Sequence, residues 1–134
     1  MLRSLSATAD RQRPYDVAIV MPTLLRPGLT RAIRSIFEQN FEGRIQILLG
    51  IDVAEGDPAQ LAALAAECPA HIAFDLFDPG YSTSIQHGGL HPNRVSGSLR
   101  TILTYAANSR RIAYLDDDNW WGPDHLATLS GAID

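Results

Sequence analysis

The chain has 134 residues, of which 46% are hydrophobic and 19% are charged, a composition that suits one globular domain and excludes a disordered protein. Its formal net charge of −4 argues against a nucleic-acid partner bound by neutralisation of the phosphate backbone. The single cysteine excludes an internal disulfide, and no apolar run approaches the roughly 20 residues of a membrane span.

The N-terminal segment is polar and contains arginine and serine, without the apolar stretch that a secretory signal needs. We therefore expect residues 1–16 to form a flexible N-terminal arm and the protein to be cytoplasmic. The domain itself is expected to occupy residues 17–134.

Three apolar runs in the first part of this domain predict strands. Residues 17–21 and 45–51 are almost continuously apolar, which is typical of central parallel strands that are covered on both faces. Residues 71–77 alternate more between apolar and polar side chains, which places this strand at or near an edge of the sheet.

Helical patterns alternate with the strands: they begin at residue 29, span residues 59–67 and about 95–108, and begin again near residue 124. A loop over residues 78–93 precedes the third helix, and loops of this length in small domains are often functional. This order predicts an α/β fold, a Rossmann-like three-layer sandwich with a mainly parallel sheet.

A fourth apolar run, residues 112–115, predicts a buried strand that leads directly into Asp116, Asp117 and Asp118. Alternate residues of an extended chain point the same way, so Asp116 and Asp118 can share one target while Asp117 faces elsewhere. Carboxylates suit Mg²⁺ or Mn²⁺, which usually bridge to substrate phosphates. The alternative is a solvated acidic turn that caps the next helix.

Parallel sheets bind ligands beyond the carboxyl ends of their strands. Three predicted loops lie there, and all of them carry polar or charged groups: residues 22–26, 52–57 and 116–119. We therefore predict one site that is assembled from three strand ends.

These landmarks resemble GT-A-fold glycosyltransferases of the family-2 type over about residues 16–134. The first strand followed by Pro22-Thr23 resembles the opening strand of the family, and the strand that ends at Asp52 resembles its base-recognising strand. The sequence Leu-Asp-Asp-Asp-Asn-Trp at residues 115–120 resembles its Asp-x-Asp signature. The resemblance implies a nucleotide-binding half-domain whose partner is a UDP- or GDP-linked nucleotide-diphospho-sugar.

The resemblance also implies roles for single residues. Pro22 and Thr23 would lie beside the nucleoside, and Asp52 would accept a hydrogen bond from the base. The residues Asp116, Asp117 and Asp118 would hold the ribose and a divalent metal, with Asp116 and Asp118 as metal ligands and Asp118 as the first choice for direct contact.

Three arginines are candidates for the remaining nucleotide contacts. Arg100 matches a basic position on the helix before the signature, and Arg94 is a second candidate for the base or the phosphates. Arg26 either meets the phosphates or solvates its loop.

The chain departs from the family in several places. Val53-Ala54 follows Asp52 where the family has a second acidic residue and Gly-Ser, and Thr101 replaces an asparagine. The family's domain continues for roughly another hundred residues, which build the acceptor site and supply the catalytic base. We therefore expect either a half-domain truncated before its acceptor half or a stand-alone remnant, with catalytic residue and acceptor unknown. Self-association through an exposed sheet edge is expected in both cases.

Two further functions compete with a glycosyltransferase donor domain. One is a nucleotide-binding module without turnover, since no evident catalytic base follows Asp118. The other is an NTPase, because an apolar strand before Asp-Asp resembles a Walker B strand, but the sequence has no glycine-rich loop with Lys and Ser/Thr.

Two pairs of residues have alternative readings. His87 and His91 have a metal-binding spacing, but Gly88 and Gly89 between them favour a mobile donor loop over a zinc site. Trp120 and Trp121 are expected to anchor the core at a strand-to-helix corner, with a sugar or acceptor pocket as the alternative for one of them.

Overall fold

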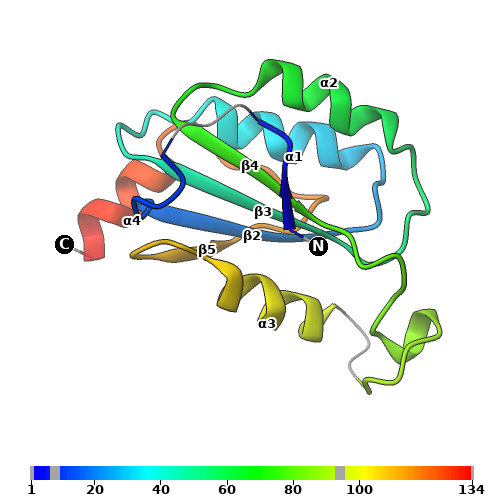
Figure 1. The fold of residues 1–134 in the computed structure, drawn as a ribbon. Coiled ribbons are helices and arrows are strands. Elements are labelled where there is room, and N and C mark those ends of the chain that lie inside the picture. Colours follow the sequence, from blue (N-terminus) through cyan, green and yellow to red (C-terminus); the bar gives the residue numbers. More distant parts are fainter. Residues whose placement is uncertain (1, 7–9, 93–95, 134) are drawn as a thin grey trace.

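The computed structural model describes residues 2–6, 10–92 and 96–133, which form an α/β domain around a single sheet (Figure 1). The strands are β1 (Leu2–Ser4), β2 (Val17–Thr23), β3 (Ile45–Ile51), β4 (Ile72–Phe77) and β5 (Ile112–Tyr114). The helices are α1 (Gly28–Phe37), α2 (Ala59–Glu67), α3 (Gly97–Ala106), α4 (His125–Ile133) and the short 3₁₀ helix η1 (Ile85–His87).

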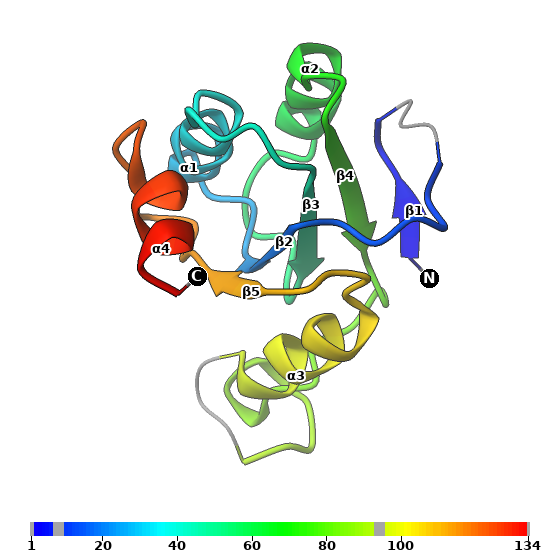
Figure 2. The same ribbon diagram turned by 90° about the vertical axis from the view of Figure 1, so that its left-hand side faces the viewer.

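The sheet has the order β1-β4-β3-β2-β5, in which β1 is antiparallel to β4 and all other neighbours are parallel. Helices α1 and α2 cover one face, with α4 beside α1, and α3 covers the other face (Figure 2). The predicted three-layer α/β fold with a mainly parallel sheet is therefore confirmed.

Every residue of β2 and β3 is buried, as their continuous apolar sequences predict. The larger core cluster lies between the sheet and α1, α2 and α4, whereas a smaller one packs α3 onto the other face through Leu99 and Leu103. The strand at residues 72–77 lies next to the edge strand β1, as its alternation predicts.

The prediction of a buried fourth strand is wrong. Strand β5 has only three residues and pairs with β2 alone, so it is an edge strand in the part of the chain that the structure describes. Its residues Ile112 and Tyr114 are 38% and 54% exposed. An apolar run shows that a strand forms, but burial also depends on which other segments cover it.

The expectation that residues 1–16 form an arm outside the domain also needs correction. Strand β1 pairs with β4, with Leu2 opposite Phe77, and Tyr15 is only 1% exposed. A strand of three residues with a polar sequence has too little pattern to be recognised, and its partner is some 70 positions away in the sequence. The described part of this segment belongs to the sheet.

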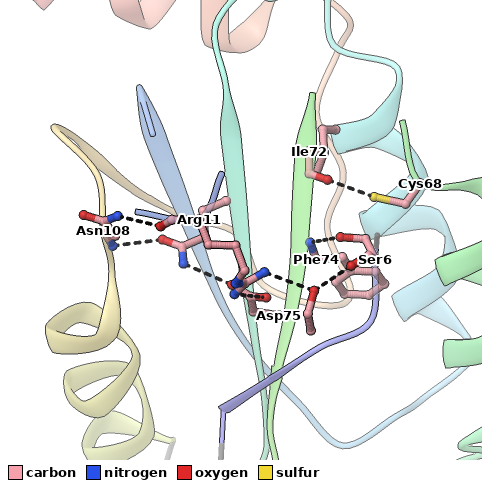
Figure 3. Close-up of polar contacts among 9 residues, drawn as sticks. Ser6, Arg11, Cys68, Ile72, Phe74, Asp75 and Asn108 are labelled. Carbon is pink, nitrogen blue, oxygen red and sulfur yellow. Dashed lines mark hydrogen bonds and ion pairs between the residues drawn. The ribbon is translucent and has the colours of Figure 1, made fainter. Parts of the chain in front are cut away.

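A buried carboxylate ties the same segment to the sheet (Figure 3). Asp75 of β4 is 0% exposed, and its Oδ1 lies 2.6 Å from Arg11 Nη2 as an ion pair. Gln46 Nε2 donates to Asp75 Oδ2 at 3.1 Å, and Gln46 Oε1 accepts from the amide of Asn108 at 2.9 Å. The side chain of Asn108 in turn donates to the carbonyl oxygen of Arg11 at 3.2 Å. These contacts join β3, β4, the N-terminal segment and the residues after α3.

Cys68, at the end of α2, is expected to react slowly with thiol reagents. Burial raises the pKa of its thiol from 9.0 to about 11, which lowers the thiolate fraction at any pH below 9. The greater nucleophilicity of a more basic thiolate offsets part of this loss, so we expect alkylation at pH 8 to be about tenfold slower in the folded chain than in the urea-unfolded chain. Equal rates measured by mass spectrometry would contradict this burial.

None of the helices within the described residues is long and apolar enough to cross a lipid bilayer.

Candidate functional site

The carboxyl ends of β2, β3 and β5 meet at one edge of the sheet, because these strands are parallel and lie in the order β3-β2-β5. A cavity of about 280 Å³ lies there. Its lining includes all the predicted site residues that the structure describes: Pro22, Thr23, Arg26, Asp52, Arg100, Asp116, Asp117 and Asp118. Arg94 lies outside the described residues. The structure thus brings together residues that are separated by almost a hundred positions in the sequence.

The three aspartates of the acidic turn have different neighbours. Asp116 Oδ1 lies 2.6 Å from Arg100 Nη2, whereas Asp117 Oδ2 accepts a hydrogen bond from Thr23 Oγ1 at 2.8 Å. Asp118 is exposed to solvent at the cavity. The turn is closed by a hydrogen bond from the amide of Asn119 to the carbonyl oxygen of Asp116 at 3.1 Å. Asp117 therefore fastens the turn to β2, and Asp116 and Asp118 are the carboxylates that remain to face a ligand.

The start of α1 packs closely against this turn. A Cβ atom at Gly28 would lie 3.1 Å from the carbonyl oxygen of Asp117 and 3.6 Å from the Cα of Asp118, so glycine permits this approach of the two backbones. The N-terminus of a helix carries partial positive charge, which favours carboxylates nearby. The helix start therefore helps the turn to keep three negative charges close together.

Thr23 is expected to be a structural support of the turn. It is 3% exposed, and its Oγ1 donates to Asp117 and accepts from the amide of Leu25 at 2.9 Å. Thr23→Val keeps the shape but removes both hydrogen bonds, so we expect the free energy of unfolding to fall by about 2 kcal/mol in urea denaturation. Thr23→Ser, which keeps the hydroxyl, is the control. Equal losses in the two variants would show that the hydroxyl is not what matters.

Asp52 is 6% exposed, and the long loop after β4 folds over it. Ser82 Oγ donates to Asp52 Oδ1 at 2.5 Å, and His87 Nε2 lies 3.9 Å from Asp52 Oδ2. This loop contains η1 and a bridge between Ser84 and His91. A nucleotide base that formed a hydrogen bond with Asp52 would have to share the carboxylate with Ser82 or displace the Ser82 hydroxyl.

Three residues that line this cavity are not indicated individually by the sequence: Leu24, Gln86 and Ser96. The length of the loop after β4 indicates a function but does not show that Gln86 lines the cavity. His87, which the sequence assigns to a donor loop, lines the cavity as well. His87 faces Asp52, whereas the backbone of His91 bonds to that of Thr83.

The two described arginines of the site are held differently. Arg100 of α3 pairs with Asp116, and Arg26 lies at the rim with its Nη2 3.7 Å from Glu55 Oε2. All four side chains are partly exposed, at 30% to 60%, and ion pairs of this kind contribute at most about 1 kcal/mol. Both guanidinium groups can therefore change partners at little cost.

A second cavity of about 580 Å³ shares Arg100 and Asp116 with the first and is also lined by Tyr114, Asn119, Trp120 and Trp121. Trp121 packs against the core and stacks on His125 with ring centroids 4.6 Å apart. Trp120 is 53% exposed, with the guanidinium carbon of Arg31 3.1 Å from its ring centroid. Only Trp121 therefore takes the predicted place at the core, and both tryptophans border the second cavity.

The acidic turn fits a hard divalent cation that takes most of its ligands from elsewhere. In residues 2–6, 10–92 and 96–133, no group of three or more His, Cys, Asp or Glu side chains is arranged to hold a metal ion. Mg²⁺ and Mn²⁺ sites often use only one or two carboxylates and complete their shell with water and substrate phosphates. Asp116 already contacts one positive charge, the guanidinium of Arg100 at 2.6 Å. This carboxylate is therefore placed to bind a cation at the predicted metal position.

The fold matches solved structures of a Staphylococcus aureus protein. The S. aureus TarS structure matches with a TM-score of 0.70 and 15% sequence identity, over 89% of this chain and 19% of that one. TarS residues 1–349 in complex with UDP match with a TM-score of 0.68 and 15% identity, over 89% of this chain and 32% of that one. The complex with UDP-GlcNAc matches with a TM-score of 0.68 and 15% identity, over 89% of this chain and 31% of that one.

At this identity the likeness shows a shared fold. The chain spans about a third or less of the length of these structures. No family model matches the sequence, and no curated protein matches it.

Proposed function

We propose that this chain is the donor-binding part of a GT-A-type glycosyltransferase and that it binds a nucleotide-diphospho-sugar at the carboxyl ends of β2, β3 and β5. The observation that carries the proposal is one cavity to which all three strand ends contribute, with four carboxylates and two arginines in its lining. Structures of the same fold in complex with UDP and UDP-GlcNAc support UDP as the nucleotide.

The positions of the residues that line the cavity suggest which part of the ligand each of them would contact. Asp52 and the loop residue His87 would meet the base, and Pro22 and Thr23 at the end of β2 would lie against the nucleoside. Arg26 at the rim would be available to the diphosphate. Asp116 and Asp118 would hold Mn²⁺ or Mg²⁺, which neutralises the charge that develops on the leaving diphosphate.

In the complete reaction, an acceptor hydroxyl oxygen would form a bond to C1 of the sugar while the bond from C1 to the diphosphate oxygen breaks. The hydroxyl proton would pass to a general base. Asp124 follows the acidic turn, but its Oδ1 accepts from Asn40 Nδ2 at 3.0 Å and it lines neither of the two cavities described above. This observation favours the second candidate, a nucleotide-sugar-binding module without turnover, for the chain on its own.

Calorimetric titration with UDP and with GDP, each with Mn²⁺ and again with EDTA, tests the proposal. We expect UDP to bind only with Mn²⁺ and to bind more tightly than GDP. A folded chain that binds neither nucleotide under either condition would refute the donor site. Incubation with UDP-GlcNAc and detection of free UDP then separates the two candidates, since a module without turnover releases none.

A further inference from the structure

The ion pair between Arg100 and Asp116 lies between the two cavities. These two residues belong to the lining of both cavities, so the pair forms part of the wall between the space at the strand ends and the space beside Trp120 and Trp121. The same Asp116 oxygen that Arg100 contacts at 2.6 Å belongs to one of the two carboxylates assigned to the metal. A guanidinium and a divalent cation that both contact this oxygen repel each other, so each disfavours the binding of the other.

We propose that Arg100 occupies the place of the divalent cation on Asp116, and that it is transferred to the diphosphate when the cation and the nucleotide bind. This inference rests on the proposed nucleotide-sugar site. Arg100 acts here as a positioning residue that makes the binding of metal and nucleotide interdependent.

The geometry allows such an exchange. Arg100 lies in the first turns of α3, where its amide donates to the carbonyl oxygen of Ser96 at 2.9 Å and its carbonyl oxygen accepts from Thr104 Oγ1 at 2.8 Å. The helix thus holds the backbone, while the side chain is 30% exposed and borders open space on two sides. Arginine also binds phosphate oxygens with two parallel hydrogen bonds, which gives the released guanidinium a partner as soon as a diphosphate is present.

A consequence for binding follows from linkage. A cation that binds alone must displace Arg100 and leave it without Asp116, so the metal alone binds weakly. A bound diphosphate contacts both the cation and the released Arg100. Metal and nucleotide therefore each raise the affinity of the chain for the other, by the same factor.

Mn²⁺ binding without nucleotide, measured by the electron paramagnetic resonance signal of free Mn²⁺, tests the exchange directly. In Arg100→Gln we expect Mn²⁺ alone to bind about fivefold more tightly than in the wild-type chain, because its competitor is gone. With saturating Mn²⁺, we expect the same variant to bind UDP about tenfold more weakly, because the diphosphate has lost a partner. The two opposite changes are the signature of the exchange.

Arg26→Gln is the matched control, since it removes a positive charge from the same cavity without touching the Arg100–Asp116 pair. We expect it to change the affinity for Mn²⁺ alone by less than about twofold. Equal tightening in both variants would reduce the effect to general electrostatics and overturn the exchange. Unchanged or weaker Mn²⁺ binding in Arg100→Gln would overturn it as well.

These outcomes are separable from failure of the proposed function. A wild-type chain that binds UDP only with Mn²⁺, combined with an Arg100→Gln variant that loses affinity for both ligands, leaves the donor site standing and removes the exchange. A wild-type chain that binds neither ligand removes both. Should Arg100→Gln fail to fold, the side-chain Nε–H signal of Arg100 in the NMR spectrum of the wild-type chain is the second measurement. It should shift on addition of Mg²⁺ and again with UDP, and an unchanged signal would overturn the exchange.

Discussion

Asp118→Asn is expected to weaken the Mn²⁺-dependent binding of UDP by about 100-fold while the chain stays folded. Asp118 is exposed at the cavity, so its replacement disturbs no core packing. The amide of asparagine carries no charge, and the loss of a charged contact of this kind costs on the order of 3 kcal/mol, which corresponds to about 100-fold in affinity. Calorimetry with UDP and Mn²⁺ measures the loss, and circular dichroism checks the fold.

The matched control for this variant is Glu42→Gln, which removes the same charge from an exposed residue in the segment before β3, at the other end of the sheet. We expect its affinity for UDP to equal that of the wild-type chain. If the two variants bound UDP alike, Asp118 would have no part in the site, and the acidic turn would be the solvated helix cap that was the alternative.

Arg11→Ala is expected to lower the free energy of unfolding by about 3 kcal/mol. The substitution leaves the fully buried Asp75 without its ion-pair partner, and removal of one member of a buried pair typically costs 3–5 kcal/mol. We choose the lower end because the Arg11 side chain is 39% exposed and Gln46 still donates to Asp75. Urea denaturation followed by circular dichroism measures the change.

Two further variants separate the buried pair from general effects. Arg13→Ala removes a nearby arginine that is exposed and should change the stability by less than about 0.5 kcal/mol. Adding Asp75→Asn to Arg11→Ala removes the uncompensated charge and should restore part of the loss. An Arg11→Ala variant as stable as Arg13→Ala would mean that the N-terminal segment contributes little to holding the sheet.

The local pattern of apolar and polar residues was sufficient to predict most of the strands and helices. Four apolar runs, separated by helical spacing and by glycine and proline, correspond to β2, β3, β4 and β5. Parallel strands that alternate with helices place all their carboxyl ends on one edge, so the three predicted loops had to meet there. For the same reason, Thr23, Asp52 and Asp116 could be assigned to one cavity without knowledge of the strand order.

The local sequence pattern failed to predict burial and strand pairing where these depend on a segment that is distant in the sequence. The run that forms β5 has the same apolar character as a central strand, but its place at the edge follows from pairing with β2 alone. Strand β1 exists because β4 offers an edge to pair with, and Arg11 belongs to the domain because Asp75 is buried opposite it. Neither partner can be read from the residues around the segment itself.

The residues along the chain are therefore enough to predict the alternation of strands and helices, the three-layer fold and the edge of the sheet where the candidate site lies. Hydrophobic periodicity and the connection rules of parallel sheets act over short distances along the chain, and they are enough for this. Two features could not be predicted in this way: Ser82 and His87 cover Asp52, and Arg100 pairs with Asp116. These contacts join side chains that are 16 to 35 positions apart, and their geometry depends on how the whole loop and helix pack against the sheet.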